Sequence, residues 1–277
     1  MFRIGTNTQS LLAQRNLGQV VRAEEKETVK LSSGSRIAKA AYDPSGLAIA
    51  TGMKAKSVSN QQVQRNVNDS ISLFQVAEGT LNVMHDIAGR LRELTIQAAN
   101  DKLSNVDRVV ANKEFRGLVT EVERLTASTK FNGNHLINGE GSVYDFQIGV
   151  NNNAKEDRIR YNLQEILDSG NNFGLNNANV LTKEAAQNNI SIVNKMTSEI
   201  SSSRAKIGSG MNRMEATLAN LQYSHENIEA SKSKIADTDF AKSTANSVKN
   251  SIMKQTTTSM LAQANTRAGV ATKLLFG

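Results

Sequence analysis

The chain has 277 residues, among them 33 Lys or Arg, 26 Asp or Glu and no cysteine. Without cysteine, disulfides, thiolate metal sites and cysteine nucleophiles are excluded. The three histidines, His85, His135 and His225, lie far apart in sequence, so neither a histidine metal site nor a histidine-based catalytic centre is expected. An aromatic content of 4% and a single proline indicate long helices packed side by side.

The net charge of +7 arises almost entirely at the two ends of the chain. Residues 1–43 hold seven basic and four acidic residues, and residues 237–277 hold five basic and two acidic residues, so each end carries +3. These basic residues are isolated and lack aromatic neighbours for base stacking, so nucleic-acid binding is not expected. Membrane insertion is not expected either, because no apolar run reaches about 18 residues. The N-terminus lacks the pattern of a cleaved secretory signal.

The first segment, residues 4–35, is predicted to be a helix with an imperfect apolar stripe. Asp43 is a good N-cap and Pro44 a good first helical residue, so a new helix is expected to begin there. We place a domain boundary at this point. The stripe of the first helix consists of Ile4, Leu11, Leu12, Val20, Val21 and Leu31.

Residues 44–99 are predicted to form one long helix with a heptad seam. A second apolar stripe on another face predicts that this helix touches at least two neighbours. Ser104 then caps a shorter helix over residues 105–129. The seam includes Val67, Phe74, Leu81 and Ala88, and the second stripe is Leu73, Val76, Val83, Ile87 and Leu94.

Residues 131–181 are rich in Asn and Gly, and helical periodicity stops there. Apolar and polar residues alternate over 143–150 and again over 158–163, which predicts a β-hairpin. Residues 168–181 are predicted to be a polar loop.

A long heptad row follows in residues 183–236, which Thr182 is expected to cap. Gly208 and Gly210 lie inside this helix, where glycine is unfavourable, so close packing or a bend is expected there. Residues 240–275 are again predicted to be helical. The heptad row consists of Val193, Ile200, Ile207, Met214, Leu221, Ile228 and Ile235.

These elements predict a mainly α fold, in which long antiparallel heptad helices form a rod-like bundle with a small β-hairpin insertion. The N- and C-terminal helices are expected to pair as a two-helix coiled coil. Residues 1–43 and 237–277 then form a terminal-helix domain, and residues 44–236 form a helical core domain. The terminal helices have too little apolar surface for a core of their own, so they are expected to order only against other copies or a partner.

Several family motifs occur along the chain, each once and in a fixed order, among them LSSGSRIAKAAYDPSGLAIA (31–50), RNVNDSISLFQVAEGTL (65–81), SKIADTDFA (233–241) and SMLAQANTRAGVATKLLFG (259–277). Through these motifs the chain resembles bacterial flagellin from end to end. Tyr42, Pro44 and Ser243 depart from the family pattern, which affects only local salt bridges. With about 50 residues between the helical halves, the chain resembles a minimal flagellin without variable outer domains.

The resemblance implies a structural subunit, without catalysis or cofactor, that polymerises into the flagellar filament used for swimming. It implies that the terminal helices line the filament channel and fold on assembly. Implied partners are further copies, an export chaperone at the C-terminal helix, the filament cap, hook-junction proteins and the flagellar type III export apparatus. The implied location is the extracellular filament, in some lineages beneath a sheath or in the periplasm. The implied assembly residues are Ile4, Leu11, Leu12, Val20, Leu31, Arg36, Met260, Leu261, Leu274 and Leu275.

The resemblance also places Arg90, Leu94 and Glu114 in a surface that a host innate receptor reads in many flagellins, although such charges are by default a solvated helix face. Three alternative functions are compatible with parts of the sequence. An ordinary coiled coil explains the heptads but not the paired terminal motifs. A hook–filament junction protein shares those motifs without forming a long polymer. A basic nucleic-acid-binding coiled coil predicts salt-sensitive DNA binding.

Overall fold

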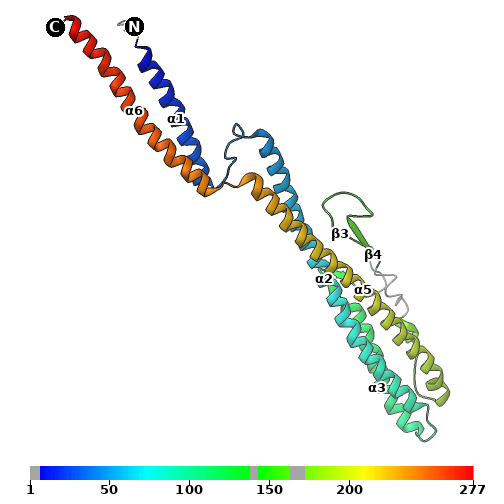
Figure 1. The fold of residues 1–277 in the computed structure, drawn as a ribbon. Coiled ribbons are helices and arrows are strands. Elements are labelled where there is room, and N and C mark those ends of the chain that lie inside the picture. The colour runs from blue at the N-terminus through cyan, green and yellow to red at the C-terminus, as the bar shows by residue number, and fades with distance from the viewer. Residues whose placement is uncertain (1–6, 138–142, 163–171, 277) are drawn as a thin grey trace. The chain divides into compact units, whose positions relative to one another are not determined.

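The computed structural model describes residues 7–137, 143–162 and 172–276, with side chains up to residue 266. Its long elements are helices (Figure 1), and two short antiparallel hairpins, β1–β2 and β3–β4, accompany them, which confirms the predicted fold class. The helices are α1 (Thr8–Ser33), α2 (Pro44–Ala98), α3 (Asn105–Ser128), α5 (Lys183–Ala236) and α6 (Phe240–Phe276), and η1 (Asn172–Gly174) is a short 3-10 turn. The strands are β1 (Lys130–Phe131), β2 (Asn134–His135), β3 (Val143–Gln147) and β4 (Arg158–Asn162).

The chain divides into two compact units. One comprises Met1–Ser57 and Asn227–Gly277, and the other comprises Val58–Glu226. The first unit therefore contains the start of α2 and the end of α5 besides the terminal helices. The expected domain division at residues 43 and 237 stays a prediction about the assembled protein.

In the unit Val58–Glu226, helices α2, α3 and α5 share one apolar core. Phe74 of α2, Phe115 of α3 and Ile200 of α5 are all fully buried in it. Helices α2 and α3 run antiparallel, since Arg90 pairs with Glu114 and Arg108 reaches the carbonyl of Ala98. The heptad pattern of the sequence thus corresponds to a closely packed seam.

Helix ends in this unit lie where the sequence predicts them. Ser104 forms a capping box with Asp107, and the Thr182 side chain accepts a hydrogen bond from the backbone N–H of Ala185 at 3.1 Å. The buried Arg108 side chain donates to the backbone carbonyls of Ala98 and Asn100, each at 2.9 Å. A cation at these carbonyls stabilises the negative end of the α2 dipole.

The β3–β4 hairpin is confirmed, with Phe146 paired to Ile159 and Tyr144 paired to Tyr161. It packs on the helices through aromatic rings. The ring of Phe74 lies 4.7 Å from that of Tyr161 and 5.7 Å from that of Phe146, both in edge-on geometry. Such pairs add stability beyond their buried area.

The polar loop predicted for residues 168–181 is wrong over its described part, residues 172–181. Four side chains there, Phe173, Leu175, Ala178 and Val180, are buried in the core. Side chains of the helices hold the backbone of this segment, because Asn112 accepts from the Val180 N–H at 2.9 Å. Asparagine and glycine dominate the local composition and conceal four apolar residues that have no helical or strand period. Residues 168–171 lie outside the described chain.

In the other unit, α1 packs against α6 (Figure 1). Gly34 ends α1 with a φ of 66°, a left-handed conformation that glycine adopts without strain. The chain then meets the junction of α5 and α6, where the Arg36 N–H donates to the Ala236 carbonyl at 2.7 Å. The Thr238 N–H donates to the Gly34 carbonyl at 3.0 Å, so backbone hydrogen bonds join the segment that follows α1 to the junction of α5 and α6.

Candidate assembly surface

The α1–α6 pair has very little apolar interior. The buried residues of α1 are Ser10, Val20 and Glu27, and only one of them is apolar. Half-buried apolar side chains, among them Leu17, Val21 and Leu31, and polar links make the remaining contact. The Ser10 hydroxyl donates to the Asn265 side chain at 2.8 Å, and Lys254 pairs with Glu24 at 2.9 Å. Exposed ion pairs contribute at most about 1 kcal/mol, so this pair of helices is weakly held within one chain.

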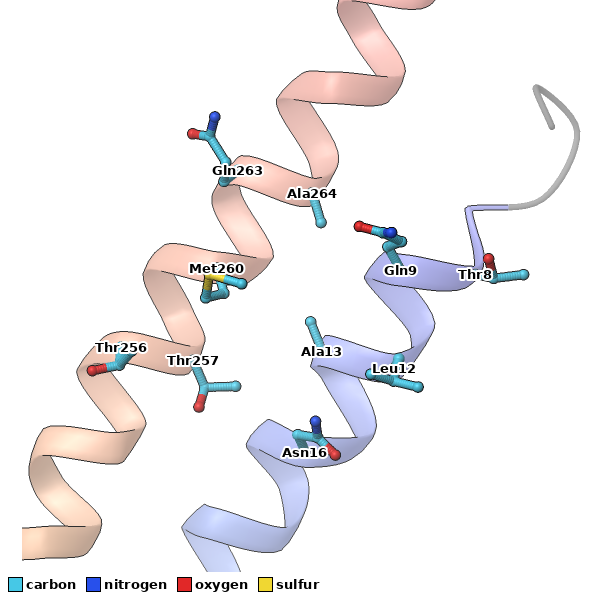
Figure 2. Close-up of a pocket in the computed structure, with 10 residues that line it drawn as sticks. All are labelled: Thr8, Gln9, Leu12, Ala13, Asn16, Thr256, Thr257, Met260, Gln263 and Ala264. Atoms are coloured by element: carbon cyan, nitrogen blue, oxygen red, sulfur yellow. The ribbon is translucent and has the colours of Figure 1, made fainter. Parts of the chain in front are cut away.

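A groove of about 560 Å³ runs between the N-terminal part of α1 and the C-terminal part of α6, and both helices contribute side chains to it (Figure 2). Leu12 from α1 is 52% exposed there and Met260 from α6 is 63% exposed. Ala13 and Ala264 leave room beside them. Large apolar side chains that remain open to water on a thin helix pair mark a surface available for another partner.

A second hollow of about 510 Å³ lies along α6 alone. It is lined by Ala245, Val248, Ile252 and Met253, with Lys249 at its side. Val248 and Ile252 are exposed and four residues apart, so they lie on one face of the helix. α6 thus presents exposed apolar side chains both at the groove that it shares with α1 and at this second hollow.

The structure distributes the predicted assembly residues over three environments. Val20 is buried, whereas Leu31 and Leu261 are half-buried. Leu11, Leu12 and Met260 are exposed, and so is Arg36, whose side chain donates to the Ile235 carbonyl at 2.9 Å. Ile4 lies outside the described residues. Leu274 and Leu275 belong to the described backbone of α6, but their side chains do not belong to the described part.

The predicted core seam is fully buried at one end and only half-buried at the other. Leu221, Ile228 and Ile235 are half-buried, and polar contacts occur nearby, with Ser57 donating to Glu229 at 2.5 Å and Asn60 donating to Ser224 at 3.3 Å. The seam is therefore less completely buried toward the C-terminal end of α5. The fully buried members are Val67, Phe74, Leu81, Val193, Ile200, Ile207 and Met214.

The proposed receptor surface needs one correction. Leu94 is only 2% exposed and belongs to the core, so it is not on the surface of this chain. Arg90 is exposed and pairs with Glu114 at 2.7 Å and with Glu93 at 2.8 Å. The hydrogen bond that Arg90 donates to Glu114 is the main cause of the raised pKa of Arg90.

The second apolar stripe of α2 is also only partly buried. Leu73 and Leu94 are in the core, whereas Val76 and Val83 are exposed. The prediction that α2 touches at least two neighbours is confirmed, because α2 shares its core with α3 and α5, although Val76 and Val83 remain exposed. Leu73, Ile87 and Leu94 share one heptad position, whereas Val76 and Val83 share another, so the two sets lie at different positions around the helix.

No group of three or more His, Cys, Asp or Glu residues that could hold a metal occurs in the described residues. Among the helices described, none is long and apolar enough to cross a membrane.

The chain is similar to flagellar proteins over nearly its full length. The profile of the bacterial flagellin N-terminal helical region matches residues 4–142, and that of the C-terminal helical region matches residues 190–275. A flagellin of Halalkalibacterium halodurans is 34% identical over 272 residues, which cover 98% of this chain and 99% of that protein. The flagellar filament 30.7 kDa core protein of Treponema maltophilum is 34% identical over 277 residues, which cover 96% of both chains.

One solved structure shares the fold at low identity. It is a Vibrio parahaemolyticus protein described as a flagellar hook-associated protein, with a TM-score of 0.59 and 15% identity over 71% of this chain and 100% of that chain. This likeness concerns the fold alone. Because the two family profiles match most of the chain and the relatives cover nearly all of it, the chain belongs to the bacterial flagellin family, as a minimal flagellin.

Proposed function

We propose that this chain polymerises into the helical filament of the bacterial flagellum and that the filament serves as the propeller in swimming. Membership of the flagellin family supports a role as a flagellar filament subunit. Flagellins are structural proteins and not enzymes, so the function lies in the surfaces that bind further copies. The observation that carries the proposal is the weakly held α1–α6 pair with its exposed Leu12, Ile252 and Met260.

The terminal helices become ordered as they pack against other copies. Ordering one residue costs about 1–2 kcal/mol of conformational entropy, whereas burying one valine contributes about 1.5–3 kcal/mol. The one buried apolar side chain of α1, Val20, therefore offsets only a small part of the cost of ordering this 26-residue helix. Burial of Leu12, Ile252 and Met260 between copies supplies the remainder. In the filament, the terminal helices form an inner layer that lines the channel. The long helices of the core form the tube around this layer.

The same apolar side chains require protection before assembly. Val248, Ile252 and Met260 are exposed on α6, and an export chaperone that covers this helix keeps the subunit from premature polymerisation. The subunit then passes unfolded through the flagellar type III export apparatus to the extracellular filament, where the cap guides insertion and hook-junction proteins form the base.

Seeded growth of the purified chain on filament fragments tests the proposal. After salting out, electron microscopy is expected to show long helical filaments that elongate with added subunit. A hook–filament junction protein gives no long polymer under the same conditions. Absence of filaments over a broad range of salt and protein concentration contradicts the proposed function.

A further inference from the structure

The turn between β1 and β2 is an Asn-Gly pair, Asn132 and Gly133, and both residues are exposed to solvent. Phe131 pairs with Asn134 across the hairpin, so the connection contains two residues only. Both have positive φ, 48° at Asn132 and 83° at Gly133, as in a type I′ turn. The turn belongs to the unit Val58–Glu226 and lies outside the assembly surface of the terminal helices.

An asparagine that precedes glycine is prone to lose its side-chain amide, because glycine has no side chain that obstructs its backbone nitrogen. In this reaction the Gly133 nitrogen attacks the Cγ atom of Asn132. The new C–N bond closes a five-membered succinimide, the Cγ–Nδ2 bond breaks, and the Gly133 N–H proton leaves with the side-chain nitrogen as ammonia. Water then opens the ring at either carbonyl and leaves aspartate or isoaspartate. Water is the only co-reactant, and no oxidant or reductant takes part.

The folded turn holds the two reacting atoms apart. Ring closure requires the Asn132 Cβ atom and the Gly133 nitrogen to be nearly eclipsed about the Cα–C bond of Asn132. At the first central position of a type I′ turn, ψ is about +30°, and these two atoms are then about 150° apart around that bond. The amide therefore cannot react while the turn keeps this conformation.

Both flanks of the hairpin hold this turn closed. Leu136 and Ile137, which follow β2, are 1% and 0% exposed in the core. On the other flank Phe131 packs against the same core, and the Leu136 N–H donates to the Thr129 carbonyl at 3.1 Å. A rotation about Asn132 that is large enough for ring closure breaks the pairing of the two strands, so the hairpin must first open locally.

We infer that Asn132 is a deamidation site controlled by the fold: the closed turn protects the amide, and the opened or unfolded chain loses it. The inference does not rest on the proposed filament function. Aspartate tolerates the left-handed conformation and permits the turn to re-form. Isoaspartate carries the backbone through Cβ and lengthens a connection of two residues, so Leu136 and Ile137 lose their register with the core. A chain that stays unfolded for long is thus marked chemically and refolds incompletely.

Mass spectrometry of the full chain tests the protection. The chain is incubated at mildly alkaline pH, folded or in concentrated urea, and is then digested with pepsin in acid, where deamidation is slow. Fragment spectra separate Asn132 from Asn138, which also precedes a glycine. Deamidation at Asn132 is expected to be slower in the folded chain by on the order of tenfold or more, because local opening comes first. Equal rates in both solutions overturn the inference, and so does an Asn132 that stays intact in urea.

Two leucine variants show whether the anchored turn itself gives the protection. Leu136→Ala loosens the anchor beside the turn, whereas Leu175→Ala removes an equally buried leucine elsewhere in the same core. Both are incubated at a temperature at which circular dichroism shows them folded. Deamidation at Asn132 is expected to accelerate more in Leu136→Ala than in Leu175→Ala. Equal acceleration in the two variants assigns the reaction to global unfolding and rules out the turn as the protecting element.

Refolding of the urea-treated chain tests the consequence of the modification and needs no core variant. A brief protease treatment after refolding removes incompletely folded molecules. The surviving chain is expected to be depleted of isoaspartate formed from Asn132, whereas the Asn132→Asp variant survives as well as the unmodified chain. An unchanged isoaspartate content after protease treatment shows that the longer backbone is tolerated and contradicts the stated consequence.

Discussion

Tyr161 of β4 lies directly over Gly210 of α5. The Tyr161 hydroxyl donates a hydrogen bond to the carbonyl of Lys206 at 2.7 Å, one turn before the glycine. A Cβ atom at Gly210 would overlap the hydroxyl and the ring of Tyr161. The contact attaches the β3–β4 hairpin to the long helix and explains one of the two glycines inside the α5 heptads.

Alanine substitutions at the two glycines of α5 are expected to have opposite effects. Gly210→Ala displaces Tyr161 and its hydrogen bond, and overpacking of this kind costs about 1–3 kcal/mol, which exceeds the gain in helix propensity. Gly208→Ala enters open space and is expected to stabilise the helix by up to about 1 kcal/mol. Thermal melting followed by circular dichroism measures both. Equal shifts of Tm in the two variants contradict the described hairpin contact.

Ile207→Asp is expected to unfold the unit Val58–Glu226 or to destabilise it severely. Ile207 is fully buried in the seam, and an unpaired carboxylate there costs several kcal/mol, about the whole stability of a small domain. Ala205→Asp, two residues away and exposed, is the matched control and is expected to melt within a few degrees of the unmodified chain. Equal melting of the Ile207→Asp and Ala205→Asp variants by circular dichroism contradicts the burial of the seam.

The hairpin is expected to lose stability in acid through Asp145. Its hydrogen bond with Arg160 lowers the pKa of Asp145 below the ordinary value of 3.8. Because the pKa is lower in the folded chain, the pair stabilises the fold above about pH 3.8, and this contribution disappears as the pH falls through the lowered pKa.

The difference in Tm between the unmodified chain and Asp145→Asn is therefore expected to be present at neutral pH and to vanish in strong acid. It should also shrink at high salt, because the pair is exposed. A difference that grows as the pH falls below 3.8 would have the wrong sign for this ion pair.

The dilute monomer is expected to be cleaved first in its terminal segments. α1 has one buried apolar side chain, whereas the seam of α2 and α5 has many. Limited proteolysis followed by mass spectrometry is expected to leave a soluble core of about residues 44–236 and to spare the ends in filaments. If the ends of the dilute monomer resist protease as well as its core does, their folding is not coupled to assembly.

Much of this fold is predictable from local sequence signals. Pro44 and Ser104 begin α2 and α3 as expected, because helix starts depend on a few neighbouring residues. The packing of Leu175 and Val180 is not predictable in this way, because partners far away in sequence decide it. The tight β1–β2 hairpin at Asn132 and Gly133, both with positive φ, was also missed within an Asn- and Gly-rich segment.

The candidate assembly surface was predicted less completely than the fold. The apolar residues of the terminal helices were identified, but their pattern does not distinguish the buried Val20 from the exposed Leu12. The resemblance places Leu94 on a surface, although its side chain is buried in the core.

Truncation of α6 tests the central claim, that the terminal helices drive assembly without being needed for the fold of the core. Deleting residues 255–277 removes Met260, Leu261, Leu274 and Leu275 from every subunit. Each leucine buried between copies contributes about 1.5–3 kcal/mol, so the loss of Leu274 and Leu275 alone lowers the polymerisation affinity on the order of a hundredfold or more. Sedimentation of seeded reactions is expected to show no filaments from the truncated chain, with a core melting temperature close to that of the full chain. Filaments of normal length from the truncated chain would contradict the account.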